Sequence, residues 1–388
     1  MKISRIINGT VFLTGRSFVR ADLEIEEGSI SSVYICGGSS DTATDAETLD
    51  ASGLRVLPGL VDIHLHGCGG HDFCEGTAEA FEAIEQYELA HGITTILPAT
   101  MSLPLDRVRE VLRAANEFRM KEDIEHLVMR GVNLEGPFLS AGKHGAQNKE
   151  HLRQPDPEAV LKLWEESGGL PRIISIAPEL DGAIECIREL SEVMTVSIAH
   201  TEADYDKAIE AFKAGASHVT HMFNSMMPFL HRDPGVVGAA LDSQADVELI
   251  CDGVHLHPSV VRAVFRMFDP SRIILISDST MGTGMGDGLF RLGDQDVDIA
   301  GNHAKLHGTD VLAGSVTNLF DCMMNAIRFG VPEERAIAAA TINPARSVGL
   351  DGKVGSISPG MAADLILIDE NYNLRGIVKA GVLHDVWR

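Results

Sequence analysis

Apolar runs alternate with amphipathic stretches through the central part of the chain, from residue 57 to residue 278. Continuous apolar runs are typical of parallel strands buried on both faces, and the stretches between them have helical periodicity. Eight such units favour a closed (β/α)8 barrel over an open sheet. The eight expected strands are Val56–His66, Thr94–Thr100, Leu127–Glu135, Ile173–Ala177, Val193–His200, His218–His221, Val247–Gly253 and Ile273–Asp278.

Helix signals lie between and beyond these strands. Thr77 is of the type favoured as an N-cap and precedes a helical pattern over Ala78–Ala90. Thr201 comes before an acidic turn, and acidic side chains are favoured where a helix begins. After the last barrel strand, Val311–Gly330 and Pro332–Ala340 predict two further helices.

Both ends of the chain instead carry short β runs separated by turn residues. Asn8-Gly9 and Glu27-Gly28 indicate tight turns, residues 37–47 indicate a polar surface loop, and Asp364–Ile368 is a short β run near the C-terminus. We infer an α/β fold in which residues 1–56 and 355–388 pair into a small discontinuous β-sandwich domain beside a TIM-like barrel of residues 57–354. The N-terminal strands are expected at Ile3–Ile7, Val11–Leu13, Ala21–Ile25 and Ile30–Ile35.

The net charge and composition of the chain limit which kinds of molecule it can bind. A formal net charge of -24 opposes binding to nucleic acid or to an anionic membrane, because both need a basic surface. No apolar run approaches the roughly 20 residues of a spanning helix, and Asn8-Gly9 interrupts the first apolar run before a signal-peptide core forms. The six scattered cysteines form no Cys-x-x-Cys pair and favour reduced thiols, so we expect a cytoplasmic protein.

The strongest local motif is Asp62-Ile63-His64-Leu65-His66 at the end of the first expected strand. Alternation along a strand predicts that Asp62, His64 and His66 point to one side, where two imidazoles can share one metal ion. For this motif alone, a pair of core histidines satisfied by their neighbours is an equally good interpretation.

Polar residues at the ends of other expected barrel strands favour the metal-site interpretation of this motif. Glu135, His200, His221 and Asp278 close the third, fifth, sixth and eighth expected strands. In a (β/α)8 barrel these positions share the C-terminal rim, where active sites of this fold lie. A divalent ion held there lowers the pKa of a bound water toward neutrality. We assign Asp278 as general acid/base; the alternative is an aspartate that caps the following loop.

Several motifs together resemble one family. PGLVDIHLHG, NLEGPF, IAPE, SIAHT, THMFNSM, DGVHLHP, ISDS and LAGS are similar, in order and spacing, to N-acetylglucosamine-6-phosphate deacetylases of the amidohydrolase superfamily. The resemblance covers nearly the whole chain. It implies a better-held metal site of Glu135, His200 and His221, and a second of His64 and His66 with Glu135 bridging. One or two divalent ions per subunit, Zn²⁺ or Fe²⁺, are therefore expected.

The resemblance also implies residues for a phosphorylated N-acetyl amino sugar. Asn224, Ser225, Arg232 and His255 are expected at the phosphate, and Gln147 at the sugar. An arginine that matches Arg232 reaches into the neighbouring subunit's site in this family, which implies a homodimer. From the residues alone, Arg232 is more simply an exposed charge, and Gln147 belongs equally well to a solvated loop.

The expected reaction is hydrolysis of N-acetyl-D-glucosamine 6-phosphate to D-glucosamine 6-phosphate and acetate, in amino-sugar or cell-wall recycling. Two other enzymatic hypotheses stay open at this point: a deacetylase for the galactosamine epimer, or another amidohydrolase such as a cyclic amidase. A non-catalytic barrel scaffold is a third hypothesis. It is disfavoured because all the expected ligands and the acid/base carboxylate occur together.

Overall fold

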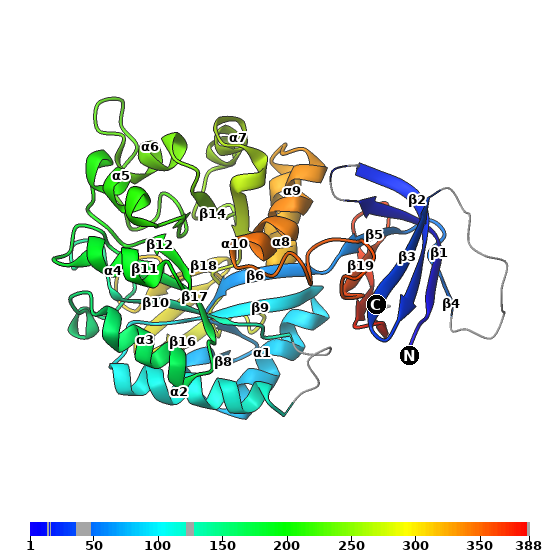
Figure 1. Ribbon diagram of the computed structural model, residues 1–388, viewed down its shortest axis with the longest axis horizontal. Helices are drawn as coiled ribbons and strands as arrows, with labels where there is room; N and C mark the ends of the chain where they lie inside the picture. The colour runs from blue at the N-terminus through cyan, green and yellow to red at the C-terminus, as the bar shows by residue number, and fades with distance from the viewer. Residues whose placement is uncertain (14, 16, 36–47, 122–127, 386–388) are drawn as a thin grey trace.

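The computed structural model describes the chain except for residues 14, 16, 36–47, 122–127 and 386–388, so the loop expected over residues 37–47 lies outside the described residues. Its largest unit is a barrel of eight parallel strands (Figure 1). In spatial order the strands are β6 (Leu60–Leu65), β9 (Ile93–Thr100), β10 (Val132–Phe138), β11 (Pro171–Ile176), β12 (Thr195–Ile198), β13 (His218–Val219), β14 (Asp246–Ile250) and β15 (Ile273–Ile276). The expected TIM-like barrel is confirmed.

The barrel closes where β15 meets β6. The backbone N–H of Asp278 donates to the carbonyl of His64 at 2.9 Å, and the N–H of His66 donates to the carbonyl of Ser279 at 2.7 Å. These bonds satisfy backbone groups that an open sheet would leave unpaired at its two edges. They also fix the first metal-ligand motif beside the end of the last strand.

A helix follows each barrel strand and covers the outside of the sheet. None of the helices in the described part of the chain is both long and apolar enough to cross a membrane. The covering helices are α1 (Ala78–Ala90), α2 (Leu105–Arg119), α3 (Pro157–Glu166), α4 (Ala183–Leu190), α5 (Tyr205–Ala214), α6 (Gly235–Asp242), α7 (Pro258–Met267) and α8 (Leu319–Arg328), followed by α9 (Glu333–Ala339) and α10 (Ile342–Ser347).

The barrel interior is layered. Val61, Leu97 and Ile274 form a buried apolar cluster with residues after α10, such as Val348 and Leu350, at one end of the barrel. A polar layer follows, in which the Thr220 hydroxyl lies 2.6 Å from that of Ser197 and 3.3 Å from that of Ser175. The metal-ligand candidates follow at the carboxyl ends of the strands. The buried apolar cluster and the polar layer thus fill the barrel interior beneath the site.

Both ends of the chain share a second sheet, as expected. Its order is β21-β20-β19-β5-β1-β2-β3, with β4 beside β1. Isolated bridges join Lys2 to Val382 and Ser29 to Ala362, so the sheet curls around its own apolar core. The exact domain boundaries stay a prediction. The strands are β1 (Arg5–Leu13), β2 (Ser17–Glu26), β3 (Ser29–Ile35), β4 (Thr48–Asp50), β5 (Arg55–Pro58), β19 (Leu365–Ile368), β20 (Leu374–Lys379) and β21 (Val382–Asp385).

Some local expectations were wrong. Asn8-Gly9 is not a turn between strands: Asn8 has φ 62° within the continuous strand β1, whose pairing with β2 shifts register there. This is a β-bulge, for which the same residue types are suited. The helix expected from Val311 begins only at Leu319, capped by Asn318. The residues ahead of it form a loop, because Leu312 bridges to Lys305 and Ser315 to Ser279.

An antiparallel sheet between β15 and α8 was not foreseen. It consists of β16 (Gly288–Leu292), β17 (Gln295–Ala300) and β18 (His303–Leu306). The turn of its first hairpin is attached to the rest of the molecule: Asp72 accepts the N–H of Gly293 at 2.8 Å, and Asp294 accepts from Asn148 at 2.7 Å. These bonds hold the sheet beside the barrel mouth, where Leu292 lines the cavity described below.

Glu88 generates a stability prediction. Burial, and next the charge of Asp62, raise the pKa of Glu88 from 4.5 to about 8. A carboxyl whose pKa is raised by folding favours the folded state below its unfolded pKa, and that contribution is lost as pH rises toward 8. Glu88→Gln should therefore match the parent near pH 4.5 and exceed it at pH 9, by on the order of 5 kcal/mol in the free energy of unfolding.

Thermal melts at pH 4.5, 7 and 9 measure this difference. Glu82→Gln, at an exposed position of the same helix, is the control and should show no such trend. A stability difference for Glu88→Gln that is the same at all three pH values would contradict the prediction.

Candidate metal centre and active site

Three of the predicted site residues lie just beyond strand ends in an unusual backbone conformation. His200, His221 and Asp278 have φ of 43°, 27° and 51°, in the left-handed region that non-glycine residues rarely occupy. Such conformations cost free energy and are found mainly where function requires a side-chain direction. Here each turn directs its side chain into the barrel mouth, and all three side chains are buried.

Glu135, His200 and His221 form the first ligand group. The Oε1 atom of Glu135 lies 3.0 Å from Nε2 of His200 and 3.0 Å from Nε2 of His221, and the two Nε2 atoms are 3.2 Å apart. Ligand atoms about 2.0–2.1 Å from a tetrahedral ion lie about 3.4 Å from one another. Three donor atoms aimed at one point with these spacings fit a divalent metal ion.

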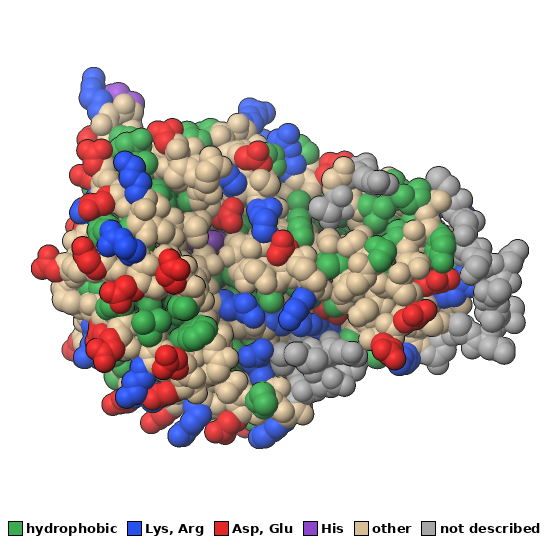
Figure 2. All heavy atoms as spheres, in the orientation of Figure 1, with side chains coloured by type: hydrophobic (Ala, Val, Ile, Leu, Met, Phe, Trp, Pro, Cys, Tyr) green, Lys and Arg blue, Asp and Glu red, His purple; other side chains and the backbone are tan. Residues whose placement is uncertain are grey.

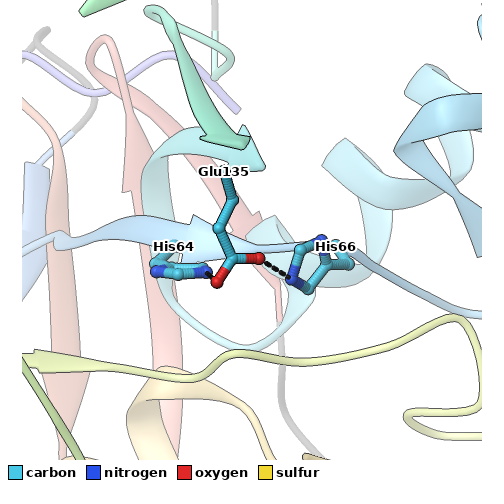
Figure 3. Close-up of side chains that lie close together, drawn as sticks. All are labelled: His64, His66 and Glu135. Atoms are coloured by element: carbon cyan, nitrogen blue, oxygen red, sulfur yellow. Dashed lines mark ion pairs between the residues drawn. The ribbon is translucent and has the colours of Figure 1, made fainter. Parts of the chain in front are cut away.

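His64, His66 and Glu135 form a second group (Figure 3). The Glu135 carboxylate lies between the two imidazoles, with Oε2 at 3.2 Å from Nε2 of His66 and Oε1 at 3.7 Å from Nε2 of His64. Nε2 of His64 is buried and has no hydrogen-bond partner. An unpaired buried nitrogen that points at a carboxylate fits a second ion, and Glu135 belongs to both groups.

The expectation that Asp62 joins these histidines was wrong. The pairing of β6 with β9 shifts between Asp62 and Leu65, so strict alternation breaks at this point. Ile63 belongs to the interior apolar cluster, while Asp62 lies near Glu88 of α1. The Asp62 carboxylate accepts a hydrogen bond from the His64 N–H at 3.1 Å. This side chain thus replaces the backbone acceptor that a regular strand pairing would provide.

Glu248 of β14 is a site residue that sequence reasoning missed. It is fully buried; its carboxylate accepts from Nδ1 of His64 at 3.1 Å, Nε2 of His218 at 3.1 Å, and the N–H of His221 at 3.0 Å. Burial opposes ionisation, but the charge of His64 and the bonds from His218 and His64 hold the pKa of Glu248 below its usual value. The signal was an acidic residue inside the apolar strand Val-Glu-Leu-Ile.

The carboxylates of Glu135 and Asp278 are stabilised in their ionised forms by the histidines beside them. Burial disfavours ionised Glu135 and Asp278, but neighbouring histidines outweigh it, chiefly the charge of His64 for Glu135 and a hydrogen bond from His66 for Asp278. The pKa of Glu135 is thereby held well below its ordinary value, and that of Asp278 is also lowered. The ionised form of Asp278, a carboxylate that can accept a proton, is therefore favoured.

A cavity of about 230 Å³ opens above these ligands. Gln147, Asn224, Ser225 and His255, the residues predicted to contact substrate, line it; their contact with substrate stays a prediction. Gln147 does more than line the cavity, because its Nε2 donates to Oε2 of Glu135 at 2.7 Å.

His255 is oriented by Asp252, whose Oδ2 lies 2.7 Å from its Nδ1. Burial lowers the pKa of His255, but the hydrogen bond and charge of Asp252 raise it above the usual value, which favours a cationic ring.

Of the predicted substrate-binding residues, Arg232 is the one that does not line this cavity within the chain. It lies with Asp233 beside a separate groove, next to the exposed apolar residues Met227, Phe229 and Leu230. Among the described residues that line the metal cavity there is no lysine or arginine.

Known proteins are similar to this chain both in sequence and in structure. Residues 55–387 match the model of the amidohydrolase family. The chain is 32% identical to N-acetylglucosamine-6-phosphate deacetylase of Bos taurus, over 97% of this chain and 94% of that protein. It is 36% identical to the enzyme of that name from Bacillus subtilis, over 81% of each.

A solved structure is similar over its full length. A variant of N-acetyl-D-glucosamine-6-phosphate deacetylase from Mycobacterium smegmatis, in complex with N-acetyl-D-glucosamine-6-phosphate, superposes with a TM-score of 0.91 at 31% identity and covers 100% of both chains.

The shared carboxylate of Glu135 generates a prediction about metal binding. Glu135→Ala should weaken binding at both metal positions by more than about 100-fold, since even supporting residues of a metal ligand contribute about 10–100-fold. His66→Asn should weaken one position only. Metal content after dialysis against defined zinc concentrations measures both effects.

Glu179→Gln is the matched control, because Glu179 is a nearby carboxylate that bonds Thr201 and Glu202 and belongs to neither ligand group. Equal metal content in Glu135→Ala and the parent would contradict the assignment.

Proposed function

Because the chain belongs to the amidohydrolase family, we propose that it hydrolyses the acetamido group of N-acetyl-D-glucosamine 6-phosphate, releasing acetate and D-glucosamine 6-phosphate. The observation that carries the proposal is the convergence of Glu135, His200 and His221 on one point, with Asp278 beside them in the same cavity. The names of the similar enzymes and the complex with N-acetyl-D-glucosamine-6-phosphate support the choice of substrate.

Asp278 is the proposed general acid/base. A divalent ion, when bound, supplies an acidified water and polarises the amide carbonyl. The Asp278 carboxylate accepts the proton of the attacking water, and then donates it to the sugar nitrogen as the C–N bond breaks. Its Oδ1 lies 3.4 Å from Nε2 of His66, so this proton is held next to the metal ligands.

We propose two ions per subunit, zinc or iron: Glu135, His200 and His221 would hold one, and His64, His66 and Glu135 would hold the other. The second ligand group supports this count, since His64 and His66 are both present and buried. Imidazole and carboxylate ligands suit both metals, and so the ligand set does not choose between them.

The substrate phosphate is proposed to bind His255, Asn224 and Ser225 of one subunit and Arg232 of a second. The described lining of the metal cavity contains no arginine or lysine, so a further cation has to come from elsewhere. Arg232 stands on a loop whose Met227, Phe229 and Leu230 are 39%, 44% and 49% exposed, as suits a surface buried in a homodimer.

The surface charge suits a small substrate better than a nucleic acid. Acidic and basic side chains both occur over the barrel face in Figure 2, with acidic ones spread across it. We propose a cytoplasmic role in amino-sugar metabolism. All five cysteines in the described part of the chain are free thiols, which supports a reducing compartment.

Acetate release from N-acetyl-D-glucosamine 6-phosphate by metal-loaded protein tests the function directly. The galactosamine epimer and a cyclic amide, assayed in parallel, separate the alternatives. Faster turnover of either one than of the glucosamine phosphate would replace the proposed substrate.

Asp278→Asn should abolish most turnover while leaving the fold and metal ligands in place. Loss of general acid/base catalysis costs about 10²–10⁴-fold in rate. Acetate release measures the loss, and metal content and far-UV circular dichroism are the controls. Turnover within threefold of the parent would refute the role of Asp278.

Arg232→Ala should raise KM for the phosphorylated sugar at least about tenfold, since a charge-assisted bond contributes about 1.5–3 kcal/mol. Any hydrolysis of unphosphorylated N-acetylglucosamine by the parent should be unchanged in the variant. Arg113→Ala, an exposed arginine of α2, is the control. Mixing Arg232→Ala with Asp278→Asn subunits should recover activity, because one mixed site then has both intact residues. Failure to recover activity from exchanged subunits would contradict the shared site.

A further inference from the structure

Glu248 has no part in the proposed chemistry, yet it is a fully buried carboxylate in the layer directly beneath the ligands. An ionised carboxylate without partners is very costly in a protein interior, so its bonding partners determine why the fold tolerates it. Both of its oxygens are occupied: Oε1 by Nε2 of His218, and Oε2 by Nδ1 of His64 and the N–H of His221.

The bond to His64 selects which ring nitrogen is left for a metal. With Nδ1–H donating to Glu248, Nε2 is the nitrogen left to bind a metal once it has lost its proton, and it lies 3.7 Å and 3.8 Å from oxygens of Glu135 and Asp278. A carboxylate in this position fixes the ring and makes its second nitrogen a better ligand. His66 lacks such support, because its Nδ1 is buried without a hydrogen-bond partner.

The bond to the His221 N–H connects the same carboxylate to the first ligand group. The main-chain carbonyl of Glu248 adds a second connection, since it accepts the N–H of Met222 at 2.9 Å. The first group has its own support as well: Nδ1 of His200 lies 2.9 Å from the carbonyl of Lys143. The first position thus has a support independent of Glu248, whereas His64 depends on it.

We propose that Glu248 is a positioning residue that determines whether the second metal position, formed by His64, His66 and Glu135, is occupied. The inference rests on the two-ion centre proposed above and concerns binding of the metal alone, without substrate. If the protein proved not to be a deacetylase, the role of Glu248 in metal binding would not be refuted. If Glu248 proved not to control the second metal position, the proposed reaction would not be refuted.

A graded series of variants at this position tests the inference. Glu248→Met removes the acceptor at similar volume, and Glu248→Gln keeps an acceptor but removes the charge. Zinc titration of the metal-free proteins, with bound metal counted by elemental analysis, should show two ions in the parent. The weaker ion should lose about 10- to 100-fold in affinity in Glu248→Met and less in Glu248→Gln, while the tighter ion changes less than about threefold.

Two further variants separate positioning from a structural role. His64→Asn removes the ligand itself and should lose the same ion as Glu248→Met. Ser175→Ala alters a buried hydroxyl of the same layer that contacts Thr220, and should retain both ions.

Three results would overturn the inference: a parent that binds one ion only, a Glu248→Gln protein that binds both ions as the parent does, or equal weakening of both ions. If Glu248→Met does not fold, Glu248→Gln decides the question, with its metal-free melting temperature as the measure of structural damage.

Discussion

The structure depends on balancing charge where water is nearly excluded. Glu135, Asp278 and Glu248 are 2%, 7% and 0% exposed, and isolated carboxylates at such depth would destabilise the fold by several kcal/mol each. Imidazoles from the three strands β6, β12 and β13, or from just beyond their ends, surround them. This arrangement leaves several ring nitrogens pointing at carboxylate oxygens, which is a geometry that a divalent ion completes. Charge compensation and metal binding are thus two aspects of one arrangement.

Closure of the barrel and alignment of the site use the same bonds. Asp278 donates its N–H to the carbonyl of His64, and the neighbouring Asp62 carboxylate accepts the N–H of His64. The first and last strands, more than two hundred residues apart in sequence, are therefore held together at the residues that carry the chemistry. A rearrangement of this seam would displace His64 and Asp278, the proposed ligand and the proposed acid/base, together, and the backbone at Asp278 is strained at the same point.

An acidic chain can accept an anionic substrate when cations are supplied locally. Within one subunit the cavity offers His255, which Asp252 orients, together with polar groups at Asn224 and Ser225. The proposed contribution of Arg232 from a second subunit would make the phosphate site depend on assembly. It would also place an exposed apolar loop in an interface, where its burial is favourable.

The sequence by itself determined the barrel, the pairing of the two chain ends and most of the site. Eight continuous apolar runs alternate with helical stretches, and the ends of parallel strands meet at one rim wherever the barrel closes, so the convergence of Glu135, His200, His221 and Asp278 was predictable. Tertiary structure alone decided the rest. The irregular β6 turned Asp62 away from the histidines, and Glu248 acquired its role only from residues on other strands. Local periodicity contains no information about a register shift or about which side chain a buried carboxylate meets across a barrel, because both depend on contacts between strands distant in sequence.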